Sequence, residues 1–401
     1  MAEPRQVAEA MLTELDLDLV SCSEIQTLWA GYGHICALEA RPRHGSSDET
    51  QRLILKLISP PPPPPQAPGQ RVDEGHVRKM LSYQVEQFWY DELAPRLDSE
   101  VAVARCLAST RSRPFADDRG LTTATILTDL RVNFPVKVHR SLTPCQVHAA
   151  LDWLARFHGS AWRWLPLDRD GFLDPPLQEV EKRGGNARAA GLWRNGGYTY
   201  LATRRREYAT LAADDTSEWS DALCRPGVDG QPPIAEQAAA FLAPDGSGSR
   251  WQTCIHGDVK SENLFAKTTG DGVAFFDFQY VGLGLGVCDL AKLFTCSVPL
   301  SMLLPTDTDE ALDSRLLPMS TGERELLDRY RSRLLQSQKD KPSDAGYEWK
   351  DLVRHWETSL VDWCRFQASW GFWGNTEWLQ ARVRNILGDV GWREWLRRQQ
   401  R

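Results

Sequence analysis

The sequence lacks the long apolar runs and the charge excess that mark several common classes of protein. None of its apolar stretches approaches the ~20 residues of a membrane-spanning helix. The first 19 residues are charged and amphipathic, without the apolar centre of a secretory signal. Basic side chains do not dominate, since 47 Lys and Arg stand against 54 Asp and Glu, a net charge of −7. This balance argues against a broad nucleic-acid-binding surface, which needs a basic excess.

The nine cysteines form no recognisable pattern. No Cys-x-x-Cys pair occurs, and no Cys and His residues lie at zinc-finger spacing. An odd, scattered set of cysteines favours reduced thiols over a disulfide framework. Together with the missing signal and membrane span, this predicts a soluble, cytoplasmic protein, with an organelle address left open. No internal repeat is apparent.

The most informative segment lies in the second half of the chain, where a polar run follows a short apolar strand. Residues 256–265 read HGDVKSENLF, and residues 276–279 read FDFQ. Asp258 would lie at the tip of a loop, where it can accept the proton of a hydroxyl or amine. Lys260, two residues later, can reach a transferring phosphate. Side chains of these types in this order meet the requirements of phosphoryl transfer.

Two oxygen-bearing side chains beside this loop predict a magnesium site. Asn263 offers an amide oxygen and Asp277 a carboxylate, ligands that suit a hard cation. Asp271-Gly272 is a favoured hairpin turn, so strands at 263–267 and 272–276 should return Asp277 to Asn263. A lone Asp-Gly or His-Gly-Asp is usually only a turn. The Asp-x-x-x-x-Asn spacing combined with the hairpin points to chemistry.

These motifs resemble those of the kinase-like superfamily of aminoglycoside phosphotransferases, choline kinases and ecdysteroid-kinase-like (CHK) proteins. The family's His-Gly-Asp-x-x-x-x-Asn catalytic loop is matched at 256–263, and its Asp-Phe-Gln metal motif at 277–279. Its Asp-Leu-Ala at the start of the next helix is matched from Asp289, which the resemblance implies braces the catalytic loop through backbone hydrogen bonds.

The resemblance implies an α+β, protein-kinase-like bilobal fold that binds ATP and Mg²⁺ in a cleft. A small lobe with an antiparallel sheet would comprise residues 1–130 and bind ATP. A larger helical lobe would comprise residues 131–401 and carry the catalytic loop and the metal motif.

The small lobe should hold a lysine and a glutamate that bind the nucleotide together. Residues 51–58 form an apolar strand pattern with a single inward lysine, Lys56, placed to hold the α- and β-phosphates. Residues 80–90 have helical apolar spacing, and Glu86 stands where the family has the glutamate that pairs with this lysine. A solvated strand lysine and an ordinary helix-surface carboxylate are the alternatives.

Two further segments are candidates for nucleotide contacts. Residues 28–38 predict a strand, a turn and a strand, in which Gly31 and Gly33 would let backbone N–H groups approach phosphate. A plain hairpin turn would have the same pattern. Residues 126–130 resemble the family's Leu-Glu-Asp-Leu hinge, which implies that the backbone at Thr128 and Leu130 binds adenine.

Flanking segments give structural expectations. Residues 143–146 have capping-box spacing with proline at the first helical position, so a helix should begin there. His158, at the end of its apolar face, is expected to be a buried packing residue rather than a catalytic one. Six prolines at 60–65 predict a stiff polyproline II insertion near 60–70. The alternative is a docking site for a proline-recognising domain.

The late part of the sequence is rich in tryptophan, for which packing in the core is expected and acceptor binding is the alternative. Most of the 16 tryptophans should belong to the core. As an alternative, some form a cage for a cationic acceptor, with Glu357 and Asp362 nearby. The segment 190–198 either shapes the acceptor pocket or is a plain loop. The tryptophans concerned are Trp356, Trp363, Trp370, Trp373 and Trp378.

We expect an ATP-dependent phosphotransferase that moves the γ-phosphate to a hydroxyl of a small molecule, as aminoglycoside, choline or steroid kinases do. A protein kinase would need an activation segment of a few tens of residues ending in Ala-Pro-Glu. Here Asp289 follows Asp277 by only twelve residues, and no Ala-Pro-Glu occurs. A catalytically idle kinase fold that serves as a binding scaffold is the third reading. The acceptor, the choice of ATP or GTP and the oligomeric state are not readable.

Overall fold

The chain folds into two compact units that alternate along the sequence. The computed structural model describes residues 3–44, 49–61, 73–112, 116–117, 120–162, 165, 171–183, 191–227, 230–304, 316–337 and 346–400. Unit 1 comprises Met1–Leu97, Val103–Pro135 and Pro176–Leu192, and unit 2 comprises Asp98–Ala102, Val136–Pro175 and Trp193–Arg401. Most of the predicted proline-rich insertion, and Ala190, lie outside the described residues. The predicted division at residue 130 stays a prediction.

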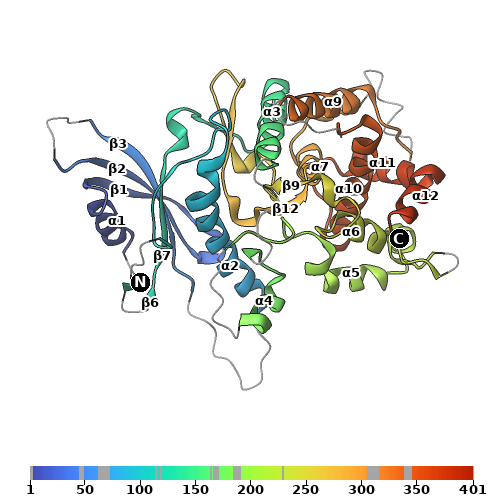
Figure 1. The fold of residues 1–401 in the computed structure, drawn as a ribbon, viewed down its shortest axis with the longest axis horizontal. Coiled ribbons are helices and arrows are strands. Elements are labelled where there is room, and N and C mark those ends of the chain that lie inside the picture. Colours follow the sequence, from blue (N-terminus) through green and yellow to red (C-terminus); the bar gives the residue numbers. More distant parts are fainter. Residues whose placement is uncertain are drawn as a thin grey trace. The chain divides into compact units, whose positions relative to one another are not determined.

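Unit 1 is built on a five-stranded antiparallel sheet of order β1-β2-β3-β7-β4 (Figure 1). Its strands are β1 (Leu17–Thr27), β2 (Gly33–Pro42), β3 (Gln51–Ile58), β4 (Cys106–Ser109) and β7 (Thr123–Thr128). A small hairpin of β5 (Ala116–Asp117) and β6 (Gly120–Leu121) is separate from the sheet. The helices are α1 (Pro4–Thr13), α2 (Glu74–Phe88), a π-helical extension of α2 (Trp89–Leu93) and α4 (Pro176–Arg183).

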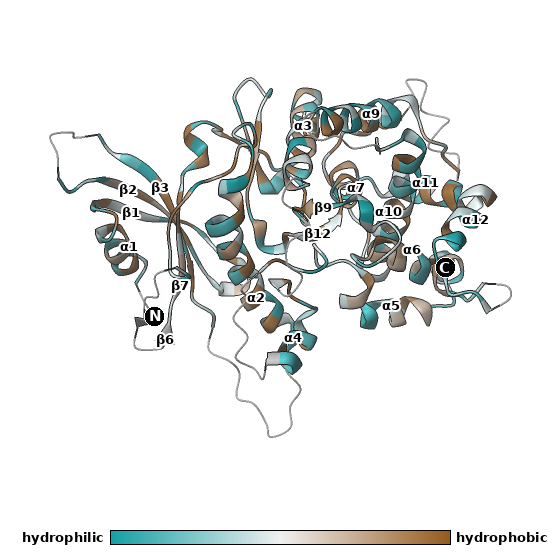
Figure 2. Ribbon diagram, in the orientation of Figure 1, coloured by the Kyte–Doolittle hydropathy of each residue, from teal (hydrophilic) through white to brown (hydrophobic). Residues whose placement is uncertain are grey.

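The alternation of β3 decides which face of the sheet carries Lys56. Leu53, Leu55 and Leu57 are buried in one cluster with α1, because successive strand side chains point to opposite faces. Lys56 therefore lies on the other face, which α2 covers (Figure 1). Figure 2 shows the hydrophobic residues of the central strands in brown.

Unit 2 is mainly helical and contains two small antiparallel sheets. One sheet has the order β11-β10-β8 and the other pairs β12 with β9. The strands are β8 (Val136–Lys137), β9 (Gln252–Ile255), β10 (Leu264–Ala266), β11 (Val273–Phe275) and β12 (Gly282–Leu285). The main helices are α3 (Pro144–Ala161), α5 (Arg205–Ala212), α6 (Ile234–Leu242), α7 (Val287–Cys296), α9 (Thr321–Gln336), α10 (Trp349–Trp370), α11 (Thr376–Gly388) and α12 (Val390–Arg398).

Helix α10 forms the centre of unit 2 and packs against α5, α6, α7 and α11. Trp356 on α10 is fully buried, and its indole N–H donates to Glu323 at 2.8 Å. Glu323 is also paired with Arg382 of α11 at 2.9 Å, with both side chains buried. The Arg382 guanidinium also donates to the Leu317 carbonyl at 2.9 Å, and such additional hydrogen bonds help a buried ion pair to be tolerated.

Several local expectations are confirmed. Helix α3 begins at Pro144, and Thr143 and Gln146 form the reciprocal capping box. His158 is fully buried and lies between the Tyr330 hydroxyl at 2.8 Å and the Asp289 carboxylate at 3.2 Å. The expected fold class, a small antiparallel-sheet part and a larger helical part, is also confirmed. None of the helices in the described part of the chain is long and apolar enough to cross a membrane.

Candidate functional site

The predicted catalytic loop is a tight turn that only glycine allows. Strand β9 ends at Ile255, and Gly257 follows with a φ of +84°. A Cβ atom at this position would lie 2.4 Å from the Tyr280 carbonyl oxygen and 2.6 Å from the Gly197 nitrogen. Glycine therefore lets the chain turn sharply in a crowded place and puts Asp258 at the tip of the loop.

Asp289 holds this turn from the first part of helix α7, as expected. Its carboxylate accepts the backbone N–H of His256 at 2.7 Å and that of Gly257 at 2.9 Å. Burial by itself would raise the pKa of Asp289, but the hydrogen bond and charge of His158 lower it overall. The clamp is thus a fully buried, ionised carboxylate whose oxygens are used by the loop and by His158.

His256 links the loop to the strand that precedes the metal motif. One of its ring nitrogens, Nε2, lies 2.9 Å from the Phe276 carbonyl oxygen, and Nδ1 accepts the N–H of Asp258 at 3.3 Å. Complete burial lowers the pKa of His256. A neutral ring that donates through Nε2 and accepts through Nδ1 satisfies both contacts.

Asp258, Lys260 and Asn263 form one hydrogen-bonded group. Lys260 Nζ lies 3.0 Å from Asp258 Oδ2, and Asn263 Nδ2 donates to the same oxygen at 3.0 Å and to the Asp258 carbonyl at 2.9 Å. Burial would lower the pKa of Lys260, but the charge and hydrogen bond of Asp258, together with the charges of Asp277 and Glu262, raise that pKa overall. The amide nitrogen of Asn263 is thereby committed to Asp258, which orients the amide oxygen away from it.

Asp277 follows the β10–β11 hairpin and adopts an unusual backbone conformation. The Phe276 N–H donates to the Asn263 carbonyl at 3.0 Å, so the hairpin returns the chain to Asn263 as predicted. Asp277 has a φ of +67°, which is uncommon outside glycine and clusters at functional sites. Its Oδ1 accepts the Gln279 side-chain amide at 2.5 Å.

The donor set at Asn263 and Asp277 fits a magnesium ion shared with phosphates. Among the described residues, no group of three or more His, Cys, Asp or Glu side chains could hold a metal by itself. Mg²⁺ is usually bound by one or two protein carboxylates or amides, with waters and substrate phosphates completing its shell. An amide oxygen and a carboxylate on one hairpin meet that requirement.

In unit 1 the structure brings Lys56 and Glu86 together. Their charged atoms are 2.5 Å apart, and the side chains are only 11% and 7% exposed. The ammonium group also lies 5.5 Å from the centre of the Tyr83 ring. The pair is buried, so the alternatives of a solvated lysine and a surface carboxylate are wrong.

Two further segments of unit 1 were predicted to contact the nucleotide, the turn with Gly31 and Gly33 and the hinge with Thr128 and Leu130. The chain turns at Trp29–Gly31 between β1 and β2, and a Cβ atom on Gly33 would lie 2.0 Å from the Leu57 carbonyl oxygen. At the end of β7, the Thr128 N–H already donates to the Arg105 carbonyl at 2.9 Å. That amide is used within the sheet, and the expectation that the backbone at Thr128 and Leu130 binds adenine stays a prediction.

The structure does not support a cage for a cationic acceptor. Trp356 and Trp378 are fully buried core residues. Of the two carboxylates, Glu357 is paired with Arg354 at 3.0 Å and Asp362 with Arg365 at 2.7 Å. The exposed ring of Trp370 already faces a cation from the chain itself, Arg204. The guanidinium lies 5.3 Å from the Tyr198 ring, 5.9 Å from the Phe366 ring and 5.1 Å from the Trp370 ring.

Sequence reasoning missed two buried cations of unit 2, Arg204 and Lys292. Arg204 is 3% exposed and Lys292 6% exposed. Lys292 stands in the otherwise mostly apolar helix α7, and a lone lysine in such a helix is a usable signal. Arg204 gave no such signal, because two of the rings that it faces, Phe366 and Trp370, lie more than a hundred residues away on α10.

Comparison with known proteins identifies the family. The model of the phosphotransferase enzyme family, APH, matches residues 45–332. The chain therefore belongs to this family of phosphotransferases, which confirms the resemblance of its motifs. No curated protein matches the chain in sequence.

Solved structures that resemble the chain include an ethanolamine kinase from Plasmodium vivax, with 11% identity and a TM-score of 0.39 over 94% of this chain and 84% of that one. The choline kinase LicA from Streptococcus pneumoniae has 12% identity and a TM-score of 0.39 over 96% and 98%. The GDP complex of wild-type aminoglycoside 2'-phosphotransferase-IIIa has 9% identity and a TM-score of 0.42 over 100% and 98%.

Proposed function

We propose that this phosphotransferase moves the γ-phosphoryl group of ATP to a hydroxyl group of a small molecule. The observation that carries the proposal is the group of Asp258, Lys260 and Asn263, held at the tip of a glycine turn by a buried carboxylate. Phosphoryl transfer needs positioning and charge stabilisation rather than covalent chemistry by the protein, and a rigid loop of this composition supplies both.

Asp258 is the proposed base. Its carboxylate would accept the hydroxyl proton while the acceptor oxygen forms a bond to the γ-phosphorus. The bond from that phosphorus to the β,γ-bridging oxygen breaks, and ADP leaves with the electron pair. Lys260 is bonded to the same carboxylate and is 35% exposed, so it can turn towards the transferring phosphate and offset its charge.

The remaining residues would hold the nucleotide and its metal ion. Asn263 and Asp277 would bind Mg²⁺, which supplies charge neutralisation at the phosphates. Lys56, oriented by Glu86, would bind phosphate oxygens, and the turn with Gly31 and Gly33 would offer backbone N–H groups. The backbone at Thr128 and Leu130 would bind the purine.

The test measures nucleotide binding and ADP release separately. Purified protein is incubated with MgATP or MgGTP and pools of hydroxyl-bearing metabolites. Asp258→Asn should keep nucleotide binding and lose acceptor-dependent ADP release, whereas Asp277→Asn should lose metal-dependent binding. Asp215→Asn, a change at an exposed acid, serves as the control.

Full transfer activity in both Asp258→Asn and Asp277→Asn would refute the assignment of these two residues. Nucleotide binding without release in any pool would favour the idle scaffold, and release with a peptide pool alone would favour a protein kinase.

A further inference from the structure

A cavity in unit 2 lies directly behind the catalytic loop. Its volume is about 260 Å³, enough for a small molecule. Ile255, the last residue of β9 before the loop, forms part of its wall, as do residues of α6, α7 and α10. All of its lining residues belong to unit 2. The charged side chains among them are Arg205, Glu236, Lys292 and Asp362.

The ion pairs at this cavity leave one cation of the lining without a paired acid, because Arg365, which lies outside the lining, neutralises Asp362. The two acids are each neutralised by an arginine: Glu236 pairs with Arg205, and Asp362 pairs with the buried Arg365 at 2.7 Å. Lys292 is the remaining charged side chain of the lining. Among the described residues no carboxylate lies within ion-pair distance of its Nζ atom. With Arg365 counted, three cations (Arg205, Arg365 and Lys292) stand against two acids (Glu236 and Asp362), an excess of one positive charge at the cavity.

The surroundings of Lys292 explain why this charge is available to a ligand. Its side chain is 6% exposed, and Nζ donates to the Gly257 carbonyl at 2.5 Å. An ammonium group has three donors, of which the Gly257 carbonyl accepts one. The charge of the buried Asp289 acts on Lys292 without an ion-pair contact. Asp289, one turn earlier on α7, uses its carboxylate for the loop amides and His158. A negatively charged ligand group in the cavity would supply the missing partner.

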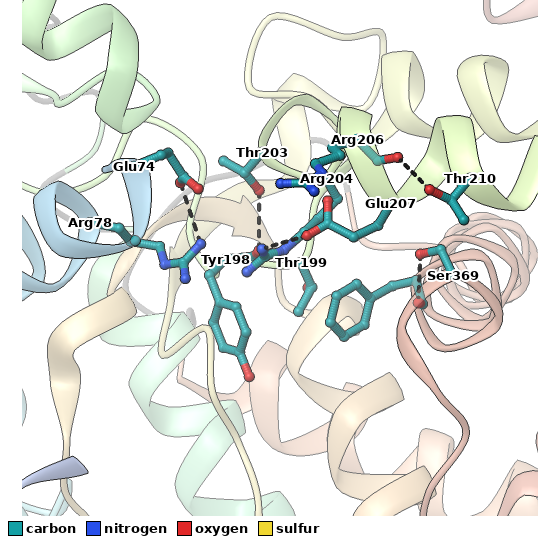
Figure 3. A network of polar contacts seen from close by, with 12 residues as sticks. Glu74, Arg78, Tyr198, Thr199, Thr203, Arg204, Arg206, Glu207, Thr210 and Ser369 are labelled. Carbon is teal, nitrogen blue, oxygen red and sulfur yellow. Dashed lines mark hydrogen bonds and ion pairs between the residues drawn. The ribbon is translucent and has the colours of Figure 1, made fainter. Parts of the chain in front are cut away.

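The aromatic rings of Tyr198, Phe366 and Trp370 also disfavour a cationic ligand, because a cation of the chain already lies against them. Figure 3 shows Arg204 with Tyr198, Thr203 and Glu207, and the Arg204 Nε donates to the Tyr198 carbonyl at 2.8 Å. The Arg204 guanidinium therefore fills the position that a ligand cation would take against the rings of Tyr198, Phe366 and Trp370. Lys292 also lies 5.9 Å from the centre of the Trp363 ring.

We propose that the phosphoryl acceptor is a hydroxyl compound that carries a negative charge, a carboxylate or a phosphate, and that this group binds in the cavity against Lys292. The proposal rests on the proposed phosphotransferase activity and names its class of substrate. Because Lys292 contacts Gly257, next to Asp258, an anionic group bound to Lys292 lies close to the loop that carries the proposed base.

The first experiment compares acceptor classes in the ADP-release assay. Pools of hydroxy carboxylates and of hydroxylated phosphate monoesters are tested against pools of neutral alcohols and sugars and of amino alcohols such as choline and ethanolamine. Release should occur with one of the two anionic pools, and which one responds distinguishes carboxylate from phosphate. Turnover of amino alcohols or neutral alcohols in preference to both anionic pools would overturn the proposal.

The second experiment tests Lys292 itself. The active acceptor is compared with its uncharged amide or alcohol counterpart. In Lys292→Met the preference in kcat/KM for the charged form should fall at least tenfold, because a charge-assisted hydrogen bond is lost. A purely structural role of Lys292 at the loop would lower the activity on both forms equally and leave the preference unchanged, which would contradict the proposal. Lys350→Met removes the same charge from an exposed site and should change neither.

A binding measurement covers the case in which no acceptor is turned over. Sodium glycerate and inorganic phosphate are titrated into the native protein and into Lys292→Met, and tryptophan fluorescence is recorded, since Trp363 lies beside Lys292. A saturable change in the native protein that Lys292→Met lacks would support the anion site although the proposed activity had failed. Equal responses of the two proteins, or none in either, would overturn it.

Discussion

The clamp formed by Asp289 gives the sharpest prediction for the catalytic loop. In Asp289→Asn the shape of the side chain is kept, so no cavity is created. The amide oxygen can take the place of Oδ2 and keep the His256 N–H and the His158 ring. The amide NH₂ group then faces the Gly257 N–H, which loses its acceptor.

The magnitude follows from this single lost contact. A hydrogen bond to a charged acceptor contributes ~1.5–3 kcal/mol, and a buried N–H left without a partner adds a penalty of ~1–3 kcal/mol. We expect the free energy of unfolding to fall by about 3 kcal/mol. Because Gly257 is no longer held, Asp258 should be misplaced, and a shift of ~1 Å in a reacting group costs ~100-fold in rate.

Urea unfolding followed by tryptophan fluorescence measures the first effect, and acceptor-dependent ADP release measures the second. Asp215→Asn changes an exposed acid, and its free energy of unfolding should stay within ~0.5 kcal/mol of that of the native protein. A loss below ~1 kcal/mol in Asp289→Asn with unchanged kcat would refute the view that this carboxylate holds the loop.

Three further predictions concern stability. Lys56→Met should cost ~3–5 kcal/mol because it leaves Glu86 buried and unpaired, and Lys56→Met combined with Glu86→Gln should recover part of that loss; additive losses in a double-mutant cycle would contradict the coupling. Gly33→Ala should destabilise far more than Gly31→Ala, since only the first places a Cβ within 2.0 Å of a backbone oxygen; equal urea midpoints would count against it. Burial lowers the pKa of His355 from its usual ~6.5 to about 4, so the unfolded chain binds the proton first as the pH falls. The free energy of unfolding should therefore decrease below pH 6.5, by about 2 kcal/mol at pH 5. In unfolding curves at pH 5 and 7.5, His355→Gln should make this pH dependence weaker.

The parts that the sequence predicted are those encoded by neighbouring residues. The strand at Gln51–Ile58, the capping box at Thr143 and the hairpin after Asn263 each follow from spacing within a short segment. The group of Asp258, Lys260 and Asn263 was predictable for the same reason, since its residues lie in one run of the chain, and its catalytic role stays a prediction. The pairing of Lys56 with Glu86 was expected only through the family resemblance, because thirty residues separate the two.

The parts that it missed depend on packing between distant segments. Arg204 meets Phe366 and Trp370 only because α10 packs beside the segment before α5. The Thr128 amide is used by Arg105 through the pairing of β4 with β7, a register that no local pattern specifies. The excess charge at the cavity arises because Arg205 pairs with Glu236 and Arg365 pairs with Asp362. These pairings form only in the folded chain.

Helix α7 carries Asp289 and Lys292 one turn apart, so both side chains leave the same face of one rigid element. Asp289 grips the catalytic loop through backbone amides, and Lys292 reaches both the loop and the cavity. A small displacement of α7 would therefore move the loop and the anion-binding group together. The separation between the anchored group and the base would be conserved, and with it the choice of which hydroxyl on a polyhydroxylated acceptor is phosphorylated.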